Sequence, residues 1–67
     1  MNLQILREER KAKGLTQEDM AKKLGYSGKS GYSLLEAGKV GVTVEMSLHI
    51  KNALGLTDEK YQEIFLT

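Results

Sequence analysis

The stretch LTQEDMAKKLG (residues 15–25) decides the fold of this 67-residue chain. It opens with Thr16, a residue type that caps helix N-termini, and Asp19 stands three positions later, where a capping box places its acidic partner. Gly25 supplies the stop at which many helices end. The pattern predicts a helix over about residues 16–24. Because this helix has only two turns, it is stable only if neighbouring helices pack on it.

The residues that follow, YSGKSG (26–31), form a polar, glycine-rich turn. A second short helix is predicted over about residues 29–37, with Tyr32 and Leu35 on its inner face and Gly38 as its stop. Two short helices joined by a tight glycine turn are the geometry of a helix-turn-helix motif inside a small helical bundle.

Three further helices are predicted around this motif, over about residues 3–13, 44–54 and 58–65. Threonine residues precede the last two as N-caps. The residues expected to face inward on the first two of these helices are Leu3, Ile5, Leu6, Ala12, Val44, Leu48, Ile50 and Leu54. The predicted fold class is an all-α, compact five-helix bundle that forms a single domain over residues 1–67.

The composition excludes several kinds of site. The chain has no cysteine for disulfides or thiolate metal sites, and its single histidine, His49, does not make a zinc site. No apolar run reaches the roughly 18 residues of a membrane span, and the charged, amphipathic start is no secretory signal. No nucleophile–base pair is found, and GKS at 28–30 lacks the earlier glycine of a P-loop. We therefore expect a small cytoplasmic domain without enzyme activity, cofactor or metal.

Charge is distributed unevenly along the chain. Residues 1–39 hold eight Lys or Arg against five Asp or Glu, a net +3, whereas residues 40–67 hold two against four, a net −2. The net charge of +1 hides this asymmetry. If the protein has a polyanionic partner, that partner is expected to face the first half of the chain.

Four motifs resemble those of a known family in order and spacing. LTQEDMAKKLG (15–25) resembles the first half of the helix-turn-helix in phage repressor/Cro-like, or Xre-type, transcriptional regulators, and LLEAGK (34–39) resembles the close of their recognition helix. VTVE (42–45) and ALGL (53–56) resemble their fourth helix and the turn after it. The resemblance covers about residues 2–65 and is nearest to short repressors of Gram-positive phages or prophages. It implies the lambda-repressor-like fold of DNA-binding domains.

The predicted recognition helix has small or polar residues on its outer face, as close approach to base edges requires. Lys29 is placed to donate to guanine, and Leu34 is placed to pack on a thymine methyl group. Ser30 and Ser33 can pair with a base edge or a phosphate. The candidate DNA-binding residues are Gln17, Ser27, Lys29, Ser30, Ser33, Leu34 and Lys39.

The resemblance also implies roles for residues outside this helix. Gln17 is expected to contact a phosphate at the start of its helix and to brace the start of the recognition helix. Arg10 and Glu36 are expected to form a structural ion pair that holds the recognition helix in place. Lys39 is expected near the DNA backbone, whereas Arg7 and the lysines after it are expected to form a solvated face.

Some positions depart from the family pattern. The turn from 26 to 32 is one residue longer than the commonest turn, which leaves two registers of base-reading residues open. Gly28 and Gly31 are expected to let the backbone approach the groove. The loop after Lys39 lacks the usual basic residues, so non-specific affinity is expected to be weaker and its salt dependence shallower. Leu34 stands where the family usually places a polar or basic reader.

The resemblance implies a sequence-specific regulator that binds double-stranded DNA, most simply a repressor that blocks polymerase by occupying an operator. Family members commonly bind pseudo-palindromic operators as homodimers, with half-sites about 34 Å apart. Such a protein would be cytoplasmic, bacterial and held at the nucleoid by its DNA. Two alternatives remain open: an antitoxin-like or control-protein regulator defined by a protein partner, and a protein-interaction module that kept the fold without binding DNA.

Overall fold

A computed structural model describes residues 1–66 of the protein. These residues form five helices and no strand, which confirms the predicted all-α, five-helix fold. The helices are α1 (Leu3–Ala12), α2 (Gln17–Leu24), α3 (Lys29–Glu36), α4 (Val44–Leu54) and α5 (Asp58–Phe65). None of the helices in this part of the chain is both long and apolar enough to pass through a membrane.

Capping side chains start the helices where the sequence places them. The Thr16 hydroxyl accepts a hydrogen bond from the Asp19 backbone N–H at 3.0 Å, and the Asp19 carboxylate accepts one from the Thr16 N–H at 2.9 Å. The predicted capping box is therefore complete, and the bond from the Thr16 backbone holds the pKa of Asp19 below its usual value. Thr43 and Thr57 cap α4 and α5 more simply, since each hydroxyl accepts a hydrogen bond from the backbone N–H three residues later.

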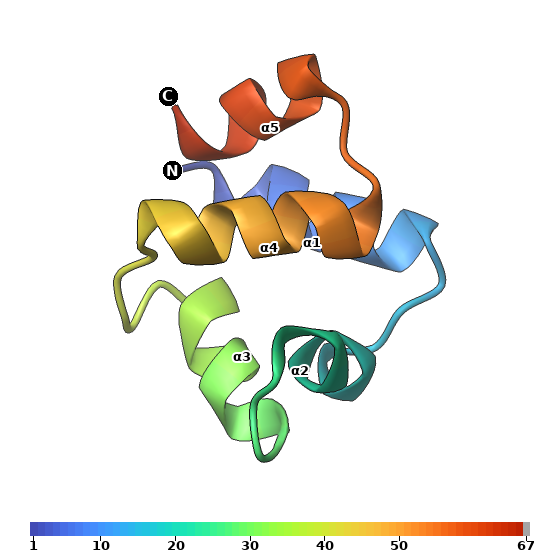
Figure 1. The fold of residues 1–67 in the computed structure, drawn as a ribbon, viewed down its shortest axis with the longest axis vertical. Coiled ribbons are helices and arrows are strands. Elements are labelled where there is room, and N and C mark those ends of the chain that lie inside the picture. The colour runs from blue at the N-terminus through green and yellow to red at the C-terminus, as the bar shows by residue number, and fades with distance from the viewer. Residues whose placement is uncertain (67) are drawn as a thin grey trace.

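Helix α4 crosses the middle of the molecule, with α1 behind it (Figure 1). Helix α5 lies on one side of α4, and the α2–α3 pair lies on the other. The backbone N–H of Asn2 donates to the carbonyl oxygen of Ile64 at 2.6 Å, so the beginning of the chain is held against α5. The α2–α3 pair is consequently far from both marked ends of the chain in this view.

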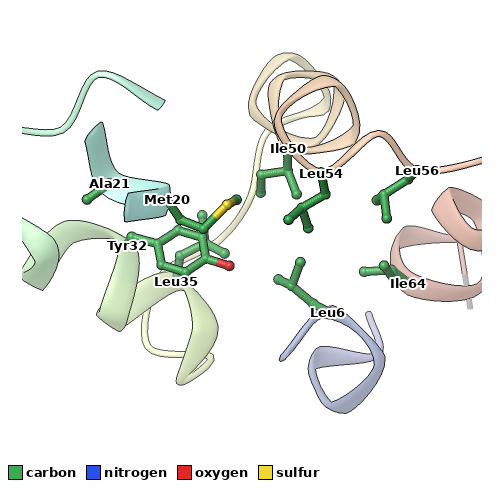
Figure 2. Packing of buried hydrophobic residues seen from close by; sticks show 9 residues of the cluster. All are labelled: Leu6, Met20, Ala21, Tyr32, Leu35, Ile50, Leu54, Leu56 and Ile64. Carbon is green, nitrogen blue, oxygen red and sulfur yellow. The ribbon is translucent and has the colours of Figure 1, made fainter. Parts of the chain in front are cut away.

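The core is a single cluster to which every helix contributes (Figure 2). Side chains of α1, α4 and α5 meet on one side of it, and those of α2 and α3 meet on the other. Its members are Leu6, Met20, Ala21, Tyr32, Leu35, Ile50, Leu54, Leu56 and Ile64. The two short helices of the helix-turn-helix are therefore stabilised by packing on longer neighbours, as their length requires.

The inner face of α4 differs from the expected one. Val44 is 74% exposed and Leu48 is 46% exposed, so the prediction that both are buried is wrong. Ser47, Ile50 and Leu54 are buried instead. These three residues follow the i, i+3, i+7 spacing of one helix face, and the Val44–Leu48 pair lies about a quarter turn or more away from it. Ala12 of α1 was also expected to face inward and is exposed.

A satisfied hydroxyl explains why a serine can occupy the core side of α4. The Ser47 Oγ bonds to the Val44 carbonyl oxygen at 2.6 Å and to the Tyr61 hydroxyl at 2.7 Å. A buried polar group that keeps its hydrogen bonds carries little penalty. A serine can therefore lie on the core side of α4 beside Ile50 and Leu54.

Candidate nucleic-acid interface

Helices α2 and α3 are joined by a short turn that starts at a left-handed glycine. Gly25 ends α2 with a φ of +85°, and the N–H of Tyr26 donates to the carbonyl of Ala21 at 2.9 Å. Gly28 stands at the N-cap of α3 without a side-chain cap. Both helices lie together at one end of the molecule, below α4 (Figure 1). This is the arrangement of a helix-turn-helix motif.

The Tyr26 ring fixes the geometry of this turn by lying against α3. A Cβ atom added at Gly31 would stand 2.6 Å from Cδ1 of the Tyr26 ring, so the ring or the helix would have to shift to accept a side chain there. The expectation that Gly31 opens the backbone toward a groove is therefore wrong, because the missing side chain faces the protein. At Gly28, by contrast, a Cβ would meet open space.

Helix α3 has one buried face and one outward face. Tyr32 and Leu35 are buried in the core, as predicted, and Glu36 is buried beside them. The outward side chains are those of Lys29, Ser30 and Leu34, which are exposed, and Ser33, which is half-buried. The outer face thus combines one cation at the helix start with small hydroxyls and one exposed leucine.

A buried ion pair attaches α3 to α1. The Arg10 guanidinium meets the Glu36 carboxylate through two hydrogen bonds, Nε to Oε2 at 2.9 Å and Nη2 to Oε1 at 3.0 Å. A third donor of Arg10, Nη1, bonds to the carbonyl oxygen of Leu15 at 2.8 Å, just before α2. Glu36 is only 1% exposed. One arginine therefore fixes the end of α3 and the entry to α2 at the same time.

Two further donors meet the same carboxylate. Gln17 Nε2 lies 3.4 Å from Glu36 Oε1, and Arg7 Nε lies 3.5 Å from it. The expectation that Arg7 belongs to a solvated face is therefore wrong. Gln17 was expected to brace the start of the recognition helix, but its contact is with Glu36, the last residue of α3. The four side chains Arg7, Arg10, Gln17 and Glu36 are called the Glu36 cluster below.

The Glu36 cluster keeps the carboxylate ionised in spite of its burial. Burial alone would raise the pKa of Glu36, but the donors around it, Arg10 first, hold that pKa below its usual value. The hydrogen bond to Glu36 raises the pKa of Arg10 in turn. The hydroxyl of Tyr32 is also buried beside this pair, and burial raises its pKa. The proximity of this hydroxyl also helps to lower the pKa of Glu36. Within residues 1–66, however, the Tyr32 hydroxyl has no hydrogen-bond partner of normal geometry.

A surface hollow lies where α1 ends and α2 and α3 begin. Lys11 and Lys29 line it, together with the start of α2 at Thr16, Gln17 and Glu18. Unpaired backbone N–H groups and the positive end of the helix dipole make such a helix start favourable for an anion. The two lysines add to this attraction, whereas the carboxylate of Glu18 opposes it.

The remaining candidate residues lie at the two ends of α3. Ser27 is exposed in the turn that precedes the helix. Lys39 is exposed just beyond it, and its backbone N–H donates to the Leu34 carbonyl at 2.9 Å. The loop that follows carries Val40, which is 43% exposed, and no basic side chain.

Residues 6–61 match the protein family described as Helix-turn-helix. This match spans most of the chain and includes both helices of the motif, so the chain belongs to this family, that of the Cro-like, Xre-type regulators. No curated protein and no solved structure matches the chain. In its general class the protein is a DNA-binding transcription regulator.

Proposed function

We propose that this protein is a repressor that binds an operator sequence in double-stranded DNA and thereby blocks polymerase. Helix α3 would enter the major groove, with Lys29, Ser30 and Ser33 facing the bases and phosphates. The observation that carries the proposal is the Glu36 cluster, which fixes α3 to α1 and α2 while the outer face of α3 stays free. A rigid helix with a small, polar outer face suits insertion into a groove.

Phosphate contacts would come from residues around α3. Gln17, at the start of α2, shares its hollow with two lysines, which supports the proposed contact between this glutamine and a phosphate. Ser27 and Lys39 flank the two ends of α3 and would contact the backbone on either side of the groove. Because these contacts are few, the non-specific affinity would be modest and its salt dependence shallow.

The proposed operator is pseudo-palindromic and is bound by a homodimer. This part of the proposal rests on the family, whose members commonly bind DNA as dimers. The two half-sites of such an operator lie about one helical turn, roughly 34 Å, apart. The protein would act in the bacterial cytoplasm, where its DNA is found.

A second candidate is a regulator whose role depends on a protein partner. It is favoured by the exposed apolar side chains of Val40, Val44 and Leu48, which lie outside the outer face of α3. Such a regulator would have the same fold and would still bind DNA, but its role would depend mainly on the bound protein.

The proposal is tested by binding fluorescent random-sequence duplexes over a salt series. Wild-type protein is expected to bind with a negative log–log salt slope, and the variant Gln17→Ala/Lys29→Ala is expected to bind more weakly with a flatter slope. The matched control is Lys22→Ala/Gln62→Ala, which removes one lysine and one glutamine from exposed positions elsewhere. Absence of binding even at low salt would overturn the repressor proposal.

A further inference from the structure

We propose that the outer face of α3 selects its operator by the methyl groups of thymine, with Leu34 as the residue that contacts them. This inference rests on the proposed DNA-binding function and deepens it by naming a feature of the operator. It assigns the central contact of the recognition helix to apolar packing, where hydrogen bonding would be the usual means of discrimination.

The first support is the composition of the outer face. Ser30, Ser33, Leu34 and Ala37 recur at the three- and four-residue spacing of one helix face. None of them carries the paired donors or acceptors with which Arg, Lys, Asn or Gln distinguishes guanine or adenine. The lysines of this region stand at its two ends, before and after this face. The middle of the helix therefore has little means of reading bases by bidentate hydrogen bonds.

The second support is the exposure of Leu34. Its side chain is 46% exposed, although it lies directly before Leu35 and Glu36, which are buried. The Glu36 cluster fixes the rotation of α3 about its axis, so the helix cannot turn to hide this leucine. Among the small side chains around it, Leu34 is the longest and would reach the base edges first. Entry of α3 into a groove would therefore remove Leu34 from water.

The third support is the chemistry that an aliphatic side chain would meet in the groove. Thymine presents a C5-methyl group in the major groove, whereas cytosine presents an N4 amino donor and guanine presents acceptors. A leucine against these polar groups would leave them without water and without a partner, which is unfavourable. A leucine against a methyl group buries apolar surface on both sides. Thymine is therefore the base that suits this position.

The experiment compares operators with and without thymine methyl groups. A random duplex library is enriched with wild-type protein, and the selected pool is then copied with either dTTP or dUTP, since uracil is thymine without its methyl group. We expect the uracil pool to bind about fourfold more weakly per half-site, the factor expected from burial of one methyl group, and about 15-fold more weakly when a dimer covers two half-sites.

The variants separate a Leu34 contact from other effects of uracil on DNA. Leu34→Ala is expected to bind both pools equally, and Leu34→Met is expected to retain most of the preference for the thymine pool. Val44→Ala changes an exposed apolar residue on α4 and is expected to behave as wild type. Circular dichroism checks that each variant is folded. If wild type and Leu34→Ala show the same thymine-to-uracil ratio, the inference is overturned while the proposed function stands. If wild type enriches no duplex from the library, the proposed function itself fails, and this inference fails with it.

Discussion

At the scale of single residues, the Glu36 carboxylate joins the end of α3 to two other helices. It is buried, charged and met by donors from α1 and α2. A buried ion pair is weak evidence for net stability, because desolvation offsets much of the attraction. Loss of one partner is different, because the other charge then stays buried with too few hydrogen bonds.

Arg10→Met is expected to lower the free energy of unfolding by about 3 kcal/mol, because Glu36 would keep only Gln17 and Arg7 as donors. Urea denaturation measures this change. The control is Lys22→Met, which removes an exposed pair with Glu18 and should cost less than about 0.5 kcal/mol. The double variant Arg10→Met/Glu36→Leu should lose less than Arg10→Met alone. Equal losses for Arg10→Met and Lys22→Met would contradict a structural role for the pair.

The lowered pKa of Glu36 makes stability depend on acid pH. Since the folded-state pKa is below the ordinary value of 4.5, the unfolded chain binds more protons in this range. The contribution of Glu36 is therefore complete above about pH 5 and is lost as the pH falls through the folded-state pKa. Denaturation at several pH values should show a shallower acid decline for Glu36→Gln than for wild type. Parallel declines would assign the acid sensitivity to other carboxylates.

At the scale of elements, the turn between α2 and α3 depends on a glycine inside a helix. Glycine normally weakens a helix by about 1 kcal/mol relative to alanine. Glycine nevertheless suits position 31, because the Tyr26 ring occupies the space that a larger side chain would need. The orientation of α3 relative to α2 therefore depends on a contact between residues only five positions apart.

Gly31→Ala is expected to destabilise the protein by about 1–2 kcal/mol, because the crowding at the Tyr26 ring exceeds the gain in helix propensity. The same change in a Tyr26→Ala background should instead stabilise it by up to about 1 kcal/mol. Thermal unfolding of the four proteins in this cycle measures both effects. A stabilising effect in both backgrounds would mean that the ring moves aside at no cost.

At the scale of the whole molecule, net positive charge is concentrated in residues 1–39, the part of the chain that contains the helix-turn-helix. Of its exposed lysines, Lys11 and Lys29 line the hollow at the start of α2, and Lys39 lies just beyond the end of α3. With about three phosphate contacts per protomer, the log–log salt slope of non-specific binding should be about −3, which is shallow for a DNA-binding domain.

Lys39→Ala is expected to reduce the magnitude of this slope by about 1, since it removes one proposed phosphate contact. Lys23→Ala removes the same charge from an exposed position near the end of α2 and should leave the slope unchanged. Fluorescence anisotropy between 50 and 200 mM salt, roughly the range in which such slopes are read, measures both. Equal changes in the two variants would point to net charge alone as the cause.

Local signals were sufficient to predict the helices. Thr16, Thr43 and Thr57 cap their helices through hydrogen bonds within four residues, and a left-handed glycine ends α2. Such interactions depend on neighbouring residues and are visible in the sequence. The inward face of α4 was predictable only in part. Ile50 and Leu54 are buried as expected, but a hydrophobic pattern does not register a buried serine such as Ser47, which bonds to Tyr61.

The site was predictable only in part for the same reason. The Arg10–Glu36 contact followed from the family resemblance, since 26 positions separate the two residues. Arg7 was missed, although it stands three positions before Arg10 and therefore shares its helix face. The packing of the Tyr26 ring against Gly31 was missed because such a contact has no signature in the sequence. The DNA contacts of α3 remain predictions.

The hydrogen bond from Asn2 to Ile64 has a consequence for rearranging the chain. It holds the beginning of the chain against α5, and both marked ends lie on the side of α4 away from the α2–α3 pair (Figure 1). A short peptide joining these ends, with a new opening at the exposed Val40–Gly41 bond, would give a circular permutant in which α3 becomes the last helix. The same proximity makes either end a suitable attachment point for a tether or a fluorescent label. Such an attachment would sit on the side of α4 away from α2 and α3.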